Sequence, residues 1–165
     1  MDFGQIYCQK CSTKLTSRRL ENEGIIPYCE KCGEFRFPMY NVAVSMIVID
    51  EKTSQILLIR QYGKPQYILV AGYVTRGERA EDAVIREVKE ETGLTVSRVS
   101  FNRTKFFEKS NTLMLNFAAY VRDMSKIQPN HEIDSYSWFT PQDARSHIYP
   151  GSLAEEFLRS FLNEF

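Results

Sequence analysis

Three glutamates near the middle of the chain are the residues best suited to chemistry. Glu87, Glu90 and Glu91 are spaced at i, i+3 and i+4, so in a helix they share one face. Like charges at this spacing destabilise a helix unless a cation neutralises them, and hard divalent cations prefer such oxygen ligands. The spacing favours a site for Mg²⁺ or Mn²⁺, and a solvated acidic helix face is the alternative.

The four cysteines form a second group with the spacing of metal ligands. Cys8 and Cys11 make one Cys-x-x-Cys pair, and Cys29 and Cys32 make the other, with seventeen residues between the pairs. Four thiolates at this spacing are typical of a closed, structural zinc site. Two disulfides or a redox site are the alternatives. Residues 1–10 lack a secretory signal pattern, so we expect a cytoplasmic, reducing compartment, where disulfides are disfavoured.

Length and composition describe an ordinary globular chain with no excess of either charge. The 165 residues are 43% apolar and 25% charged, and 21 basic residues balance 21 acidic ones. Zero net charge disfavours a dedicated nucleic-acid binder, which usually has a basic excess. No apolar run reaches the roughly 18 residues that a membrane span needs, so no membrane partner is expected.

The pattern around these residues predicts a mixed α+β chain. Strands are expected in six apolar runs, at residues 42–49, 56–60, 67–74, 94–101, 113–121 and 133–139. A helix is expected at 79–91, because its apolar residues repeat at three and four positions, and Gly93 is placed to end it. Further helices are expected at Pro141–His147 and in the tail. One apolar stripe covers the tail helix: Leu153, Phe157, Leu158, Phe161, Leu162 and Phe165.

The string from Gly72 to Leu94 resembles the signature of the Nudix hydrolase superfamily at every specified position. It has Gly72, five residues, Glu78, seven residues and then Arg86-Glu87-Val88-Lys89-Glu90-Glu91-Thr92-Gly93-Leu94. The chain resembles most closely the NADH pyrophosphatase (NAD diphosphatase) family, in which a four-cysteine ribbon also precedes the Nudix domain. Phe37-Pro38, Val70-Ala71-Gly72-Tyr73 and Pro150-Gly151 agree with that family. Its usual N-terminal domain before the ribbon is not expected here.

The resemblance implies a fold and an assignment of domains. A mixed β-sheet is expected between helices, as an α/β/α sandwich, preceded by a small zinc ribbon. Residues 1–37 would form the ribbon and residues 38–165 the Nudix domain. A homodimer is also expected from related enzymes.

The resemblance also implies roles for individual residues. The Mg²⁺ or Mn²⁺ ligands would be the carbonyl of Ala71 and the carboxylates of Glu87, Glu91 and Glu132, with Glu90 as a further ligand or a base. Arg86 would orient the glutamates, and Glu78 would hold the preceding loop through a charge pair. The residues nearest the substrate would be Phe37 and Tyr73, which stack on a base, with Ala154 and Phe107.

Some of these residues have simpler explanations. Glu78 and Arg86 would also fit a surface ion pair of little energetic weight. Phe37 would fit core packing, and Glu132 would fit a surface acid at a strand edge.

The expected reaction is metal-assisted attack of water on a pyrophosphate bond, with Glu91 or Glu90 as the general base. A small nucleotide is the expected substrate, with NAD(H) first, and with ADP-ribose or another nucleotide sugar or dinucleotide as the alternative. NAD-capped RNA is a variant of the same chemistry. A Nudix-fold regulator that binds ligand without turnover belongs to a different class. The proline-rich segment of the NADH pyrophosphatases is replaced at residues 104–112, where Phe107 takes the position of a tryptophan and Glu108 is new.

Overall fold

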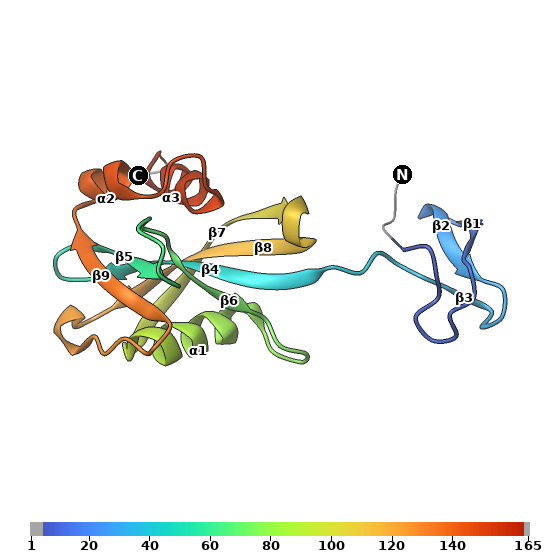
Figure 1. Ribbon diagram of the computed structural model, residues 1–165, viewed down its shortest axis with the longest axis horizontal. Coiled ribbons are helices and arrows are strands. Elements are labelled where there is room, and N and C mark those ends of the chain that lie inside the picture. The colour runs from blue at the N-terminus through green and yellow to red at the C-terminus, as the bar shows by residue number, and fades with distance from the viewer. Residues whose placement is uncertain (1–4, 164–165) are drawn as a thin grey trace. The chain divides into compact units, whose positions relative to one another are not determined.

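The computed structural model describes residues 5–163 and divides the chain into two compact units, Met1–Tyr40 and Asn41–Phe165 (Figure 1). The sequence placed a boundary after residue 37, and the structure divides the chain after Tyr40. Phe165, the last residue of the expected apolar stripe, lies outside the described residues.

The first unit is a small antiparallel sheet that carries the four cysteines. Its strands are β1 (Thr16–Leu20), β2 (Gly24–Cys29) and β3 (Glu34–Phe35), in the order β1-β2-β3. Each cysteine pair closes a tight turn. The N–H of Ser12 donates to the carbonyl of Cys8 at 2.7 Å, and that of Gly33 donates to the carbonyl of Cys29 at 2.8 Å. Gly33 has a φ of 69°, which glycine adopts without a steric cost.

The second unit is built on a mixed sheet of six strands. Five follow the order β7-β8-β4-β5-β9, and β6 pairs with β4. The pairing of β4 with β8 is parallel, and the other pairings are antiparallel. The strand bounds are β4 Asn41–Asp50, β5 Ile56–Gln61, β6 Val70–Tyr73, β7 Val96–Phe107, β8 Thr112–Val121 and β9 Ile133–Phe139.

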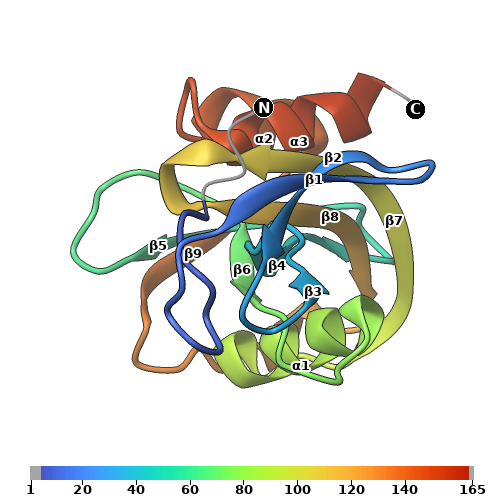
Figure 2. The ribbon, with the colours of Figure 1, turned by 90° about the vertical axis from the view of Figure 1, so that its right-hand side faces the viewer.

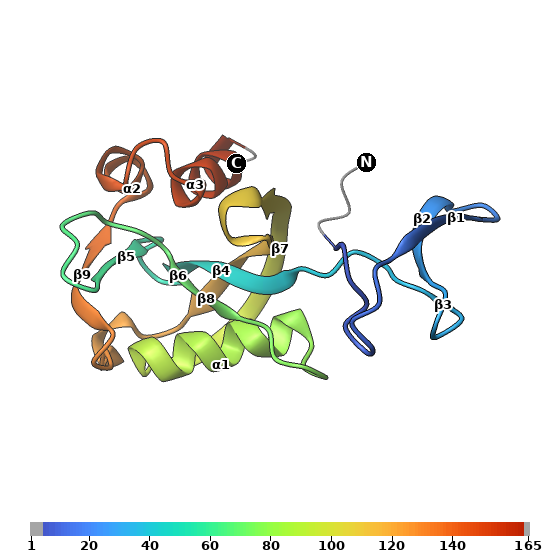
Figure 3. The ribbon, with the colours of Figure 1, turned by 45° about the vertical axis from the view of Figure 1, so that its right-hand side comes forward.

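Helices cover both faces of this sheet. Helix α1 (Ala80–Thr92) lies on one face, and α2 (Pro141–His147) and α3 (Leu153–Asn163) lie on the other, as Figure 2 and Figure 3 show. Two short 3₁₀ helices, η1 (Glu108–Ser110) and η2 (Met124–Lys126), complete the unit. The expected α/β/α sandwich is confirmed. No helix among residues 5–163 has both the length and the apolar character needed to cross a membrane.

Side chains of β4, which is buried from Ala43 to Asp50, alternate between the two faces of the sheet and contribute to two hydrophobic cores. Val44 and Met46 pack in the cluster beneath α1, whereas Ile47 packs in the cluster beneath α2 and α3. A strand buried on both faces reads as a continuous apolar run, which is why the sequence shows β4 clearly.

Strand β7 is longer than expected. The sequence ended it at residue 101, but it continues to Phe107, with a register shift against β8 between Phe101 and Arg103. It is an edge strand, and most of its residues are exposed or half-buried. Its polar second half therefore gives no apolar signal.

Phe157 in α3 tests the core beneath α2 and α3, because it is fully buried. Phe157→Ala should lower the free energy of unfolding by about 3–5 kcal/mol through lost burial and a cavity. Urea denaturation measures this change. The control is Ile85→Ala, since Ile85 is exposed on α1 and its loss should cost less than about 1 kcal/mol. Equal effects of the two changes would contradict the packing described here.

Candidate active site

Arg86 on α1 links the loop before the helix to the helix carboxylates. Its Nε and Nη2 donate to the two carboxylate oxygens of Glu78 at 2.8 and 3.0 Å, and Nη2 also donates to the carbonyl of Tyr73 at 3.0 Å. Its Nη1 donates to Glu87 at 2.7 Å and to Glu90 at 3.1 Å. All five N–H groups of the guanidinium are thus used, which fixes its plane and orients three carboxylates.

Glu78 ties the β6–α1 loop to this guanidinium. The backbone N–H and the hydroxyl of Thr75 both donate to its carboxylate at 3.0 Å. The hydrogen bonds from Arg86, followed by the N–H of Thr75, lower the pKa of Glu78 to about 2. The Glu78 side chain is 14% exposed and that of Arg86 is 30% exposed. The two therefore form a partly buried, bidentate pair, which is stronger than a solvated one.

Glu87 lies against the backbone of Gly72 in β6. A Cβ at residue 72 would come within 2.0 Å of the Glu87 carboxyl carbon, far inside van der Waals contact. Only glycine leaves room for this carboxylate. Ala71, whose carbonyl is a predicted ligand, precedes Gly72 and pairs with Ser45 of β4.

Glu91 is a buried carboxylate, with 3% of its surface exposed. Gln61 at the end of β5 donates its Nε2 to one Glu91 oxygen at 2.9 Å. Burial, followed by repulsion from Glu87 and Glu132, raises the pKa of Glu91 to about 8. A buried acid among other acids favours either a proton or a cation. These donors fit Mg²⁺ or Mn²⁺, which prefer oxygen ligands.

Glu132 is brought to Glu91 by the loop that follows η2. The backbone N–H groups of Gln128 and Asn130 donate to the carbonyls of Thr92 and Glu91 at 2.7 and 2.9 Å, so this loop satisfies carbonyls left open at the end of α1. Glu132 follows directly, and its repulsion contributes to the raised pKa of Glu91.

The carboxylates share one region but are not gathered at ligand distance from one another. Among residues 5–163, the four cysteines are the one group of three or more His, Cys, Asp and Glu side chains whose ligand atoms all lie within 4.8 Å of one another. Arg86 holds Glu87 and Glu90, so a cation would compete with the guanidinium for them.

The cysteine cluster has the dimensions of a zinc site. Its sulfur atoms lie 3.9 Å apart for Cys8 and Cys32, 3.5 Å for Cys11 and Cys29, and 3.4 Å for Cys11 and Cys32. A tetrahedral site with sulfurs about 2.3 Å from zinc has sulfurs about 3.8 Å apart. Burial raises the pKa of Cys8, but hydrogen bonds from Arg36 and from backbone groups outweigh this and bring that pKa to about 6. No disulfide joins the four.

The predicted substrate residues are dispersed. Tyr73 lies next to the carboxylates, because its carbonyl accepts from Arg86, and its side chain is exposed. Phe107 ends β7, and Ala154 lies in the first turn of α3 and packs against the cluster on the face of the sheet opposite α1. Phe37 belongs to the first unit and is exposed. Within the second unit, the described contacts join Tyr73 to the glutamates through Arg86, and they join neither Phe107 nor Ala154 to them.

Gln61 and Tyr62 contact the site carboxylates and were not predicted. Gln61 could have been recognised, because it follows Leu57 and Ile59 on the α1 face of β5 as a polar residue in an apolar position. Tyr62 follows the strand and has no comparable signal. Its hydroxyl donates to Glu132 at 3.2 Å.

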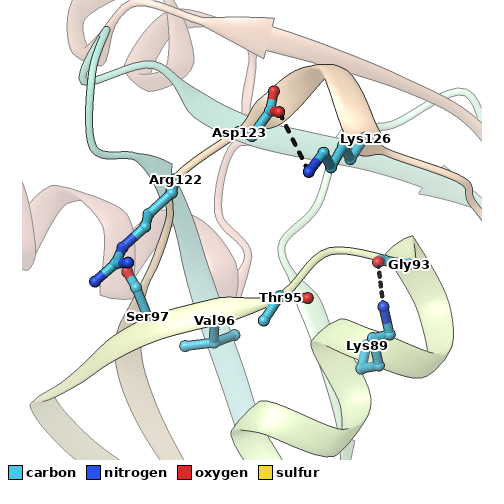
Figure 4. A pocket seen from close by; sticks show the side chains of 8 residues that line it. All are labelled: Lys89, Gly93, Thr95, Val96, Ser97, Arg122, Asp123 and Lys126. Carbon is cyan, nitrogen blue, oxygen red and sulfur yellow. Dashed lines mark hydrogen bonds and ion pairs between the residues drawn. The ribbon is translucent and has the colours of Figure 1, made fainter.

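A pocket at the C-terminal end of α1 is separate from the carboxylates (Figure 4). Eight residues line it, and none is a predicted site residue: Lys89, Gly93, Thr95, Val96, Ser97, Arg122, Asp123 and Lys126. Lys89 donates to the carbonyl of Gly93 at 2.8 Å, and Lys126 pairs with Asp123 at 3.8 Å. These cations are therefore engaged within the protein.

The family assignment rests on a match that covers nearly the whole second unit. Residues 39–161 match the family model of the NUDIX domain. The chain belongs to the Nudix hydrolase family, and the superfamily predicted from residues 72–94 is confirmed.

Two curated relatives carry the name NAD-capped RNA hydrolase NudC. The protein from Pseudomonas aeruginosa (strain LESB58) is 29% identical over 136 residues, which cover 81% of this chain and 47% of the relative. The protein from Pseudomonas putida (strain ATCC 47054) is 31% identical over 140 residues, which cover 83% and 49%. The chain thus spans about half the length of the curated relatives it matches.

Solved structures share the fold. A NUDIX hydrolase from Nitrosomonas europaea has a TM-score of 0.67 at 20% identity, covering 97% of this chain and 92% of that one. The MutT protein from Methanosarcina mazei Go1 has a TM-score of 0.62 at 22% identity, covering 76% and 94%.

Gly72→Ala should move the Glu87 carboxylate, because the new Cβ would overlap it. The flexible glutamate can swing away, so the fold should persist while Mn²⁺ affinity falls roughly tenfold or more. Titration calorimetry with Mn²⁺ measures the affinity. Gly24→Ala is the control for backbone strain, because its φ of 86° disfavours alanine, but Gly24 lies in the first unit and a Cβ there would meet no atom within 4 Å. Unchanged Mn²⁺ affinity in Gly72→Ala would contradict Glu87 as a ligand.

In the absence of Mg²⁺ and Mn²⁺, Glu91 should make the free energy of unfolding decrease as the pH rises. Its pKa rises from 4.5 to about 8 on folding, so the folded chain holds the proton more tightly and loses stability as pH rises between these values. Glu91→Gln cannot ionise, and its unfolding free energy should gain on wild type by up to about 1.4 kcal/mol per pH unit in that window. Denaturant melts at pH 5 and pH 8.5 measure the difference. Parallel pH profiles would show that Glu91 ionises freely.

Proposed function

We propose that this chain hydrolyses the pyrophosphate bond of a nucleoside diphosphate linked to another group, with an NAD(H)-like molecule as substrate. The observation that carries the proposal is Glu91, a buried carboxylate that faces Glu87 and Glu132. Such a cluster is stable in its ionised form only with cations present. Glu87, Glu91, Glu132 and the Ala71 carbonyl are the proposed ligands, with Glu90 as a further ligand or base.

The chain's own residues supply positioning and proton transfer. Bound Mg²⁺ or Mn²⁺ would neutralise the phosphates and lower the pKa of water. Arg86 orients Glu87 and Glu90, and Glu78 keeps the β6–α1 loop against that guanidinium. Glu91 or Glu90 accepts the proton of the attacking water, as a base within reach of it must. Phosphoryl transfer asks little more of a protein than positioning and charge stabilisation.

The substrate class rests on the relatives and on Tyr73. The relatives named as NAD-capped RNA hydrolases match most of this chain, and the exposed ring of Tyr73 beside Arg86 suits stacking on a base. Phe37, Phe107 and Ala154 are proposed to contact the rest of the substrate. The altered segment at residues 104–112 keeps ADP-ribose and other dinucleotides as the second candidate. All the carboxylates are present, which disfavours a regulator without turnover.

The cysteine cluster is proposed to hold structural Zn²⁺. Its sulfur spacing and the absence of a disulfide among Cys8, Cys11, Cys29 and Cys32 support this. A reducing compartment such as the cytoplasm keeps four thiolates free for the metal.

The test is product analysis after incubation with NADH and Mg²⁺ or Mn²⁺. We expect AMP and reduced nicotinamide mononucleotide from the wild type, and a loss of at least about 100-fold in kcat for Glu91→Gln, since the base and a ligand are lost. NAD-capped RNA, ADP-ribose and dinucleoside polyphosphates form parallel arms. Undiminished turnover by Glu91→Gln would refute the site. Cleavage of ADP-ribose but not NADH would refute the NAD(H) assignment alone.

A further inference from the structure

The end of β5 and the residues after it contact two carboxylates from different elements. Gln61 donates to Glu91 of α1 at 2.9 Å, and Tyr62 donates to Glu132, which precedes β9, at 3.2 Å. We propose that Gln61 and Tyr62 are positioning residues that hold these two carboxylates toward a shared cation. The inference rests on the proposed function, because that function makes both carboxylates metal ligands.

Two consecutive residues of a regular strand point to opposite faces. Leu57 and Ile59 pack beneath α1, so Gln61 continues that face and residue 62 would point to the other. Tyr62 instead has a φ of 56°, and Gly63 follows with a φ of 68°. This left-handed corner turns the chain, and the hydroxyl of Tyr62 reaches Glu132.

The corner is held by an irregularity in β9. Arg60 pairs with Ser135, but Gln61 pairs with Ile133, which leaves Asp134 as an extra residue. The carboxylate of Asp134 accepts the N–H of Gly63 at 2.6 Å. Bulges of this kind redirect side chains and are frequent next to active sites.

Packing does not explain the left-handed tyrosine. Side chains other than glycine rarely adopt this region, and the strain persists only where surrounding structure imposes it. Tyr62 is 69% exposed, so its ring buries little surface in return. The left-handed pair Tyr62 and Gly63 belongs to a tight turn, in which the N–H of Lys64 donates to the carbonyl of Gln61 at 3.1 Å. This turn also brings the Tyr62 hydroxyl to Glu132.

The charge of the donors separates the site into two parts. Arg86 is a cation and holds Glu78, Glu87 and Glu90. Among the described residues, Gln61 and Tyr62 are the side-chain donors to Glu91 and Glu132, and both are neutral. A neutral donor fixes the orientation of a carboxylate without neutralising it, so its charge stays available to a metal ion. Such outer-shell donors typically change metal affinity 10- to 100-fold when removed.

The experiment compares Gln61→Met and Tyr62→Phe, which remove the donors and keep the size of the side chains. Mn²⁺ affinity is measured from the free Mn²⁺ signal in electron paramagnetic resonance, together with kcat, substrate KM and the melting temperature. We expect each change to weaken Mn²⁺ binding roughly tenfold. The change in kcat should follow the loss of metal, while substrate KM at saturating Mn²⁺ stays close to the wild-type value. The melting temperature should stay close to that of the wild type in Tyr62→Phe and fall in Gln61→Met, because the buried Glu91 loses its hydrogen-bond donor.

Matched controls are Gln142→Met and Tyr149→Phe. Both positions are exposed, and no described contact joins them to Glu91 or Glu132. Both controls should bind Mn²⁺ as the wild type does.

The outcomes separate this inference from the proposed function. Wild-type Mn²⁺ affinity in both Gln61→Met and Tyr62→Phe, when Glu91→Gln weakens it, would overturn the positioning role. A wild type that binds no Mn²⁺ would overturn it as well. Weaker Mn²⁺ binding in both variants, in a protein that cleaves none of the substrates tried, would support the positioning role and refute the proposed reaction alone.

Discussion

The burial of one carboxylate among others is the constraint on which the second unit depends. Glu91 is nearly inaccessible to solvent, and burial together with the charges of Glu87, Glu132 and Glu90 raises its pKa. A globular protein rarely buries an ionisable group without an opposite charge or a hydrogen-bond partner. Here Gln61 supplies one hydrogen bond. A proton or a divalent ion can offset the rest of the free-energy cost of burying the ionised carboxylate. The cation site proposed for these carboxylates would offset that cost.

The surroundings of the glutamates divide according to charge. On the side of the β6–α1 loop, Arg86 gathers Glu78, Glu87 and Glu90 and offsets part of their negative charge. On the side of β5 and β9, neutral groups hold Glu91 and Glu132. The donors on the second side therefore orient their carboxylates without offsetting any charge. Gly72 lets the first side approach the sheet, because no side chain separates the Glu87 carboxylate from β6.

The sequence predicts the elements whose signal is local. The run at 42–49 and the helix at 79–91 agree with Asn41–Asp50 and Ala80–Thr92 within a residue or so, because a doubly buried strand and an amphipathic helix both have clear apolar patterns. The second half of β7 gave no such pattern, since an exposed edge strand need not bury side chains. The ends of the strands were harder to predict from the sequence for the same reason.

The candidate site residues show the same difference, because some have a local sequence signal and others are placed by distant parts of the chain. The shared face of Glu87, Glu90 and Glu91 follows from their spacing once the segment is predicted to be a helix. Glu132 was proposed through family resemblance alone, because its place is set by backbone hydrogen bonds from its loop to the end of α1. Tyr62 could not be found, since its direction depends on a left-handed backbone and on a bulge in a strand 70 residues away.

The contact between α1 and the loop that carries Glu132 couples the end of the helix to the position of this acid. The N–H groups of Gln128 and Asn130 close the last turn of the helix, and a Cβ at residue 93 would come within 3.1 Å of the Cβ of Gln128. Detaching the loop would expose helix carbonyls and carry Glu132 away from Glu91 in the same event. The end of the helix and the downstream acid thus open as one cooperative unit. Any slow opening seen by amide hydrogen exchange at residues 128 and 130 is also a disassembly of the site, and ligand binding would slow that exchange.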